Sequence, residues 1–289
     1  MSQLKSALQS GKFVVTAEVA PPKGVDVSEM LENAHLLHSR VDALNITDQQ
    51  SSVMRLGSLA ACHLLKERGV ETIFQMTARD RNRIALQSDM LSAHVLGLEN
   101  LLCLTGDFTT LGDHPHAKPV FDLDSVGLLR VARQLEHGRD MSDKELKGSP
   151  KFFLGAVVTP GANPLEPQLF KMEKKVAAGA QFFQTQAVYE PGKFESFMRY
   201  AEQFKVPVLV GIIPLKSVGM ARFMNKNVAG VHVPDDLIEE LGKAEDKYKK
   251  TLEMTARLIG QMKPMCQGVH LMAIGWETKV PEILDVAGL

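Results

Sequence analysis

NLLCLTGD, residues 100–107, is an apolar run that ends abruptly at a glycine and a carboxylate. Runs of this shape are typical of buried parallel strands, which deliver a polar residue into a site at their carboxyl end. Seven similar runs rich in Val, Ile, Leu and Phe occur elsewhere, each followed by helical periodicity. The eight predicted strands cover residues 13–18, 41–47, 71–77, 100–105, 152–158, 181–186, 206–213 and 268–274.

Strand followed by helix, repeated eight times, predicts an α/β fold, the (β/α)8 TIM barrel. The length of 289 residues suits that fold. An open, doubly wound sheet is the alternative, because a sequence does not show whether a sheet closes. No linker rich in Gly, Ser or Pro divides the chain, so we expect a single barrel domain over residues 1–289.

The connections between these strands differ in length. Helical periodicity predicts helices over residues 28–39, 51–68, 84–96 and 169–178. Residues 108–119 form a long polar loop after the fourth strand, where insertions are often functional. Before the last strand we expect an extra helical segment, formed by residues 235–241 and by a highly charged helix over residues 243–262 on the outside of the barrel.

Bulk composition narrows the class of partner. The formal net charge is −1, which gives no basic excess for nucleic acid or for an anionic membrane surface. No apolar run is long enough to span a bilayer, and the first residues lack a signal-peptide core, so we expect a cytoplasmic protein. Cys62, Cys103 and Cys266 are too far apart for a metal site or a disulfide framework, and we predict small buried hydrophobic residues and no metal.

Two carboxylates follow apolar strands and are candidates for chemistry. Glu18 follows the first strand, and partial removal from water would favour its protonated form, as a general acid requires. An ion pair with Lys23 or a cap on the loop is the simpler alternative. Asp107 follows the fourth strand, where Gly-Asp is also common turn chemistry.

Six stretches together resemble the methylenetetrahydrofolate reductase family across nearly the whole chain. Each is weak singly, but their order and spacing make the set specific. They are residues 17–23, 76–82 with 86–88, 104–107, 173–180, 184–186 and 211–214. The resemblance implies a flavin-containing barrel that reduces 5,10-methylenetetrahydrofolate to 5-methyltetrahydrofolate, with FAD, or FMN, as the cofactor.

The resemblance also implies roles for individual residues. Glu18 matches the general acid that promotes opening of the imidazolidine ring to the 5-iminium cation. Asp107 matches the aspartate beside flavin and pterin, where a negative charge would stabilise that cation. Gln186 matches a glutamine that places the substrate on the flavin.

Cofactor contacts are expected at several strand ends. The resemblance places Thr47, Thr105, Gly106, Lys174 and Lys175 on flavin-contacting positions, the two lysines near a phosphate. Thr77, Arg79 and Asp107 complete the predicted set, with Arg79 as a further phosphate ligand.

The chain departs from the family pattern at positions that, in the family, contact the flavin or the nicotinamide cofactor that donates electrons. Gln75 stands where the family commonly has a histidine, and Val218 stands where many NADH-using members have a phenylalanine. The Asn163-Pro164 pair resembles the branch of anaerobic one-carbon metabolism, in which some relatives receive electrons through a partner subunit. We therefore predict methylenetetrahydrofolate as substrate, NAD(P)H or a partner subunit as electron donor, and a homo- or hetero-oligomer.

Two other functions remain open at this stage. One is a pterin-binding barrel that transfers a methyl group without flavin, and such a protein would be colourless. The other is a non-catalytic barrel subunit of a larger complex. Glu18, Asp107 and Gln186 occurring together argue against the second function.

Overall fold

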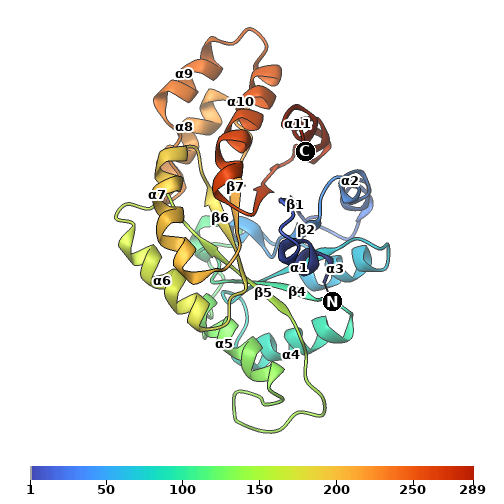
Figure 1. Ribbon diagram of the computed structural model, residues 1–289. Helices are drawn as coiled ribbons and strands as arrows, with labels where there is room; N and C mark the ends of the chain where they lie inside the picture. The colour runs from blue at the N-terminus through green and yellow to red at the C-terminus, as the bar shows by residue number, and fades with distance from the viewer. Residues whose placement is uncertain (1) are drawn as a thin grey trace.

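Eight parallel strands close into a barrel in the computed structural model, which describes residues 2–289 (Figure 1). Each strand pairs with the next in sequence, and β8 pairs with β1, so the predicted closed barrel is confirmed and the open sheet is wrong. The strands are β1 (Val14–Val19), β2 (Ala43–Ile46), β3 (Thr72–Thr77), β4 (Asn100–Leu104), β5 (Phe153–Val158), β6 (Phe182–Ala187), β7 (Val208–Ile212) and β8 (Gly268–Leu271).

Helices cover the outside of this barrel and also the end at which its strands begin, which is called the lower end below. They are α1 (Gln3–Gln9), α2 (Ser28–His38), α3 (Ser58–Lys66), α4 (Arg83–Val95), α5 (Ser125–Glu136), α6 (Glu166–Ala177), α7 (Pro191–Ala201), α8 (Val218–Asn227), α9 (Asp235–Lys243), α10 (Lys247–Met262) and α11 (Val280–Val286). Asn82 caps α4 by accepting hydrogen bonds from the backbone N–H groups of Ile84 and Ala85. The barrel therefore has the expected strand–helix alternation, with additions before β1 and before β8.

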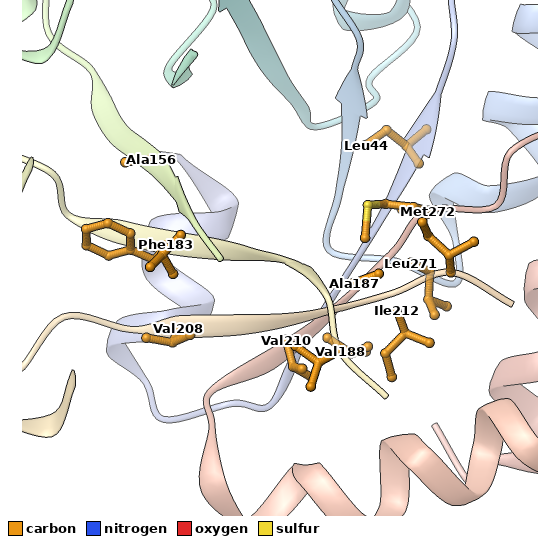
Figure 2. Close-up of a cluster of buried hydrophobic side chains, with 14 of the residues drawn as sticks. Leu44, Ala156, Phe183, Ala187, Val188, Val208, Val210, Ile212, Leu271 and Met272 are labelled. Carbon is orange, nitrogen blue, oxygen red and sulfur yellow. The ribbon is translucent and has the colours of Figure 1, made fainter. Parts of the chain in front are cut away.

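Alternate residues of each strand point to opposite sides of the barrel wall, and both sides are filled. The outward-facing residues pack against the helices, and Figure 2 shows part of this layer around Phe183, Val208, Val210 and Ile212. Inside, the lower part of the barrel is apolar and includes Val14, Ala43, Ile73, Leu102, Phe153, Phe182 and Leu209. A packed lower interior leaves the carboxyl ends of the strands as the place for a site.

Helix α1 was not predicted, and it closes the lower end of the barrel. Leu4 and Leu8 pack into the inner apolar cluster, and Leu4 is completely buried. The hydroxyl of Ser2 caps α1 and also donates to Asn100 Oδ1 at 2.5 Å. Seven residues are too few for a clear periodic signal, so this helix depends on its contacts with the barrel.

Removal of the Leu4 side chain is expected to destabilise the barrel. Leu4→Ala should lower the free energy of unfolding by about 2–3 kcal/mol, because it leaves a cavity beneath the strands. Urea unfolding followed by the fluorescence of Trp276, the single tryptophan, measures this. Gln3→Ala, on the exposed side of α1, is the control. Equal stability of the two variants would contradict the role of α1 as a plug.

Two helix predictions need correction. The helix predicted over residues 51–68 begins only at Ser58, because Ser51 and Ser52 have left-handed backbone with φ of 54° and 60°. The charged helix before β8 is not an extra helix: α10 is one of the helices that cover the outside of the barrel, where it buries Leu252, Leu258 and other residues and contacts β7, α7 and α11. The added helices are α8 and α9, which lie above α7 in Figure 1.

Candidate active site

A layer of polar side chains lies above the apolar interior of the barrel. Thr16, Asn45, Gln75, Gln184 and His270 are all buried on inward-facing positions of β1, β2, β3, β6 and β8. Asn45 and Gln184 exchange two amide hydrogen bonds across the barrel, of 2.7 and 3.0 Å. Because buried polar groups need partners, this layer fixes the floor on which a ligand at the mouth would rest.

Glu18 lies at the upper edge of this layer, two residues beyond Thr16 on β1. Its Oε1 atom is 3.4 Å from His270 Nε2 and 3.5 Å from Gln75 Nε2. Its Oε2 atom accepts from Gln50 Nε2 at 3.3 Å. Only 13% of the side chain is exposed, so the carboxyl is oriented by polar neighbours and has restricted contact with water.

The alternative partner for Glu18, Lys23, is used elsewhere. Lys23 pairs with Asp113 in the loop after β4, and Asp113 also accepts from the Met54 N–H at 3.1 Å. Gly112 packs directly on Ser52, where a Cβ would lie 1.8 Å from the Ser52 carbonyl oxygen. The loops after β1, β2 and β4 therefore contact one another on one side of the mouth.

Asp107 is exposed just after β4, and its backbone is held in place by Arg79. Its carbonyl oxygen accepts from Arg79 Nη1 at 3.3 Å. Arg79 is almost fully buried and also forms a two-pronged pair with Asp80, at 2.8 and 2.7 Å. Arg79 thus connects the segments that follow β2, β3 and β4, and most of its N–H donors already have partners. It does not have the free guanidinium that was expected of a phosphate ligand.

Thr47 is the predicted cofactor contact whose hydroxyl is still available. It is buried, and its Oγ1 atom has no hydrogen-bond partner among residues 2–289. Such atoms are rare unless a ligand or water satisfies them. The hydroxyls of Thr77 and Thr105 are engaged instead, with Asp48 Oδ2 at 3.0 Å and with the Ser125 N–H at 3.1 Å.

Gly106 lies on the same side of the site and packs too closely for a side chain. Its φ is +93°, and a Cβ would lie 3.0 Å from Arg79 Cβ and 3.2 Å from Thr77 Cβ. The positive φ and the close contact with Arg79 and Thr77 therefore favour glycine at this turn. This bare turn and the unpaired Thr47 hydroxyl fit a flavin.

Gly106→Ala is expected to lower the free energy of unfolding by about 1–3 kcal/mol, because it forces an alanine into left-handed backbone against Arg79. Flavin retention should fall with it. Gly192→Ala in α7 is the control, since a Cβ there meets nothing within 4 Å. Chemical denaturation and the flavin-to-protein absorbance ratio measure both effects. Full flavin retention in Gly106→Ala would show that this turn does not approach the cofactor.

Lys174 and Lys175, expected to act together, lie in different environments. Lys174 is exposed on α6. Lys175 is buried, and its ammonium donates to the Val157 carbonyl at 2.6 Å near the tip of β5. Burial lowers the pKa of Lys175 to about 8, with a further contribution from Lys171. A buried ammonium with one backbone partner suits an anionic group, so Lys175 is the better candidate of the two for the expected phosphate contact.

Gln186 is oriented by an irregularity in β6. The pairing of β6 with β7 shifts between Gln184 and Ala187, which is a bulge. Gln186 Oε1 accepts from the Ala187 N–H at 3.0 Å, which holds the half-buried carboxamide at the strand end. The bulge was not visible in the sequence.

None of the three cysteines was predicted as a site residue, although Cys103 lies near enough to Lys175 for the two groups to interact electrostatically. All are buried, as predicted, and burial raises the pKa of Cys103 to about 12 and that of Cys266 to about 11. His270 was not predicted as a site residue, although its position two residues after Gly268, on the inward face of an apolar strand, was a usable signal.

A family model described as methylenetetrahydrofolate reductase matches residues 3–288. The chain belongs to the methylenetetrahydrofolate reductase family. A relative named methylenetetrahydrofolate reductase 2 from Schizosaccharomyces pombe is 25% identical over 245 residues, and one named probable methylenetetrahydrofolate reductase (NADPH) from Caenorhabditis elegans is 26% identical over 265 residues. The alignments cover 76% and 87% of this chain but only 36% and 37% of those relatives, so the chain spans little more than a third of their length.

Solved structures agree on the fold of this methylenetetrahydrofolate reductase family member. A protein from Clostridium thermocellum that binds two copies of 5-methyl-5,6,7,8-tetrahydrofolic acid is similar with a TM-score of 0.68 at 17% identity, covering 99% of this chain and 98% of the other. An oxaloacetate acetylhydrolase is similar with a TM-score of 0.56 at 12% identity, covering 99% and 83%. Within residues 2–289, no helix combines the length and apolar character needed to cross a membrane.

Proposed function

We propose that the chain reduces 5,10-methylenetetrahydrofolate to 5-methyltetrahydrofolate with a bound flavin, FAD or FMN, and Glu18 as the general acid. The observation that carries this proposal is the position of Glu18. In a chain of this family, its carboxyl lies at the mouth of the barrel, held by three polar side chains. The Clostridium thermocellum protein of similar fold binds methyltetrahydrofolate, which supports a folate ligand at such a mouth.

In this reaction each of the proposed site residues has a defined role. Glu18 holds a proton and donates it to the ring nitrogen of the folate that leaves, which opens the imidazolidine ring to the 5-iminium cation. The carboxylate of Asp107, at the tip of β4, stabilises this cation. A bound flavin would supply the hydride, which no amino-acid side chain can carry. Gln186, near the end of β6, orients the pterin.

The cofactor would be held by the groups that the barrel leaves ready for it. Thr47 Oγ1 would gain the hydrogen bond that it lacks, and Gly106 would lie against the ring system. Lys175 would pair with a phosphate. The unpaired Thr47 hydroxyl and the buried Lys175 ammonium are the observations that support a bound flavin.

We propose that electrons reach this site through a partner subunit or through NAD(P)H bound in a modified way. Gln75 contacts Glu18 where the family commonly has a histidine, and Val218 begins α8 where many NADH-using members have a phenylalanine. Steady-state assays with NADH, NADPH and a low-potential donor distinguish the two sources. Efficient NADH oxidation by the isolated chain would remove the need for a partner.

One experiment tests the central proposal. The purified chain should be yellow, and mass spectrometry of the released cofactor should identify FAD or FMN. Chemically reduced protein mixed with 5,10-methylenetetrahydrofolate should form 5-methyltetrahydrofolate in an amount equal to the bound flavin. A colourless chain that transfers methyl groups would favour the alternative, and a yellow chain without folate reduction would favour a non-catalytic subunit.

A further inference from the structure

His270 is the end of a buried polar chain that reaches Glu18. Thr16 and His270 are register partners on β1 and β8, and Thr16 Oγ1 lies 3.0 Å from His270 Nδ1. The other ring nitrogen, Nε2, lies 3.4 Å from Glu18 Oε1. The ring therefore connects the interior layer on one side with the proposed acid on the other.

The neighbours of Nδ1 decide which ring nitrogen carries the hydrogen. One hydrogen of Gln184 Nε2 is donated to Asn45 Oδ1, and the other faces Thr16 Oγ1 at 3.2 Å and His270 Nδ1 at 3.4 Å. Thr16 thus accepts from Gln184 and has its own hydrogen to donate. His270 Nδ1 is its nearer acceptor, since the Val269 carbonyl oxygen lies at 3.5 Å.

Thr16 Oγ1 and Gln184 Nε2 can both donate to Nδ1, and this arrangement favours Nδ1 as the acceptor. A neutral imidazole that accepts at Nδ1 carries its hydrogen on Nε2. With the amide groups oriented as in the structure, the hydrogen is on the ring nitrogen that lies 3.4 Å from Glu18 Oε1. The buried network therefore favours the tautomer whose N–H group is on the side of the carboxyl.

We infer that His270 is a positioning residue for Glu18, whose Nε2–H group fixes the carboxyl and stabilises the carboxylate left when the proton departs. This inference rests on the proposed function. An N–H donor stabilises a carboxylate more than a protonated carboxyl, so the contact strengthens as the proton is transferred. It would thereby raise kcat more than it would improve folate binding.

The other groups recorded in contact with this pair are neutral. Gln75 and Gln50 face the carboxyl from β3 and from the turn after β2, and Thr16 and Gln184 face the ring from β1 and β6. Among the contacts of residues 2–289, Glu18 and His270 are thus the two members of the cluster with ionisable side chains. A change in pH dependence in a His270 variant can therefore be assigned to this pair.

Three substitutions separate the donor to Glu18 from the structural role of the ring. Gln places an amide nitrogen near the position of Nε2, and Asn places one near Nδ1, so His270→Gln can reach Glu18 and His270→Asn reaches only Thr16. His270→Phe removes both groups. We expect His270→Phe to lower kcat about 20-fold with KM for folate within about 3-fold, and to shift the basic limb of the kcat profile to higher pH.

Recovery of kcat by one variant and not by the other tests the assignment of His270 Nε2 as the donor to Glu18. His270→Gln should recover kcat to within about 5-fold of the wild type, and His270→Asn should resemble His270→Phe. Equal rescue by Gln and Asn, or a loss confined to KM, would overturn the inference. Flavin content and thermal unfolding of each variant show whether the barrel has kept its fold.

A measurement without turnover keeps this inference separate from the proposed function. In ¹⁵N spectra of the histidine rings, assigned by comparison with His270→Gln, wild-type His270 should be the Nε2–H tautomer. Glu18→Gln should shift its Nε2 signal, and Thr16→Val should mix the two tautomers. A ring with its hydrogen on Nδ1 would refute the inference, even if the chain reduces folate. Conversely, a chain without folate reduction would refute the proposed function, while the spectra would still decide the hydrogen bond.

Discussion

Glu18→Gln is expected to lower kcat for folate reduction by about 10²–10⁴-fold, with flavin still bound. The substitution keeps the size of the side chain and can still accept a hydrogen bond from His270 Nε2, but it removes the acidic proton. No acidic side chain other than Glu18 contacts this cluster among the hydrogen bonds and ion pairs recorded for residues 2–289. Ring opening would then depend on water.

The measurement is single-turnover formation of 5-methyltetrahydrofolate by the reduced protein, with the flavin-to-protein ratio determined on the same sample. Glu29→Gln, the same chemical change on an exposed carboxylate of α2, is the control and should leave the rate within about 2-fold. An unchanged rate in Glu18→Gln with flavin fully bound would show that another group supplies the proton.

Lys175→Met is expected to weaken flavin binding by about 100-fold and to stabilise the protein without flavin. The ammonium is buried with one backbone partner, so it would contribute a strong charge-assisted bond to a phosphate. In the absence of that anion, the buried charge opposes folding. Replacing it with an apolar side chain of similar length should raise the free energy of unfolding by about 1–2 kcal/mol.

The pH dependence of stability gives an independent check. The ordinary pKa of lysine is 10.5, and in the folded protein the pKa of Lys175 is lowered to about 8 by burial. Between these values the unfolded chain binds more protons than the folded one, so wild-type stability gains from this group as pH rises from 8 to 10.5. The advantage of Lys175→Met should therefore be largest below pH 8 and should shrink above it.

Lys174→Met gives the matched contrast, because it removes the same charge from the exposed side of the same helix. It should change flavin affinity by less than about 5-fold and stability by less than about 0.5 kcal/mol. Equilibrium dialysis with FAD and with FMN, together with urea unfolding of the flavin-free protein, measures both quantities. If the two variants lost flavin equally, the burial of Lys175 would not distinguish the phosphate ligand.

Much of the barrel followed from local sequence, because its strands are continuous apolar runs that end in polar residues. The predicted strand over residues 100–105 agrees with β4 to within one residue, and the segment before β8 is helical as expected. Helix α1 and the role of α10 were missed. Their positions depend on which apolar face meets the barrel, and periodicity alone does not say what a face will contact.

The candidate site was predictable only in part. Glu18 and Asp107 could be named as candidates because they follow apolar strands, but only the family resemblance gave them roles. The partners of Glu18 could not be found in the same way. His270 is 252 positions away in the chain, and it meets Glu18 only because β8 closes against β1.

The sequence by itself determined the number and order of the strands, the polar residues at their ends and the family, since these depend on residue type and spacing. Tertiary structure alone decided which of the predicted polar groups remain without a protein partner. It left Thr47 Oγ1 without a partner, engaged Arg79, and separated Lys175 from Lys174. The physical reason is that hydrogen-bond satisfaction and burial are properties of neighbours in space, which barrel closure brings together from distant parts of the chain.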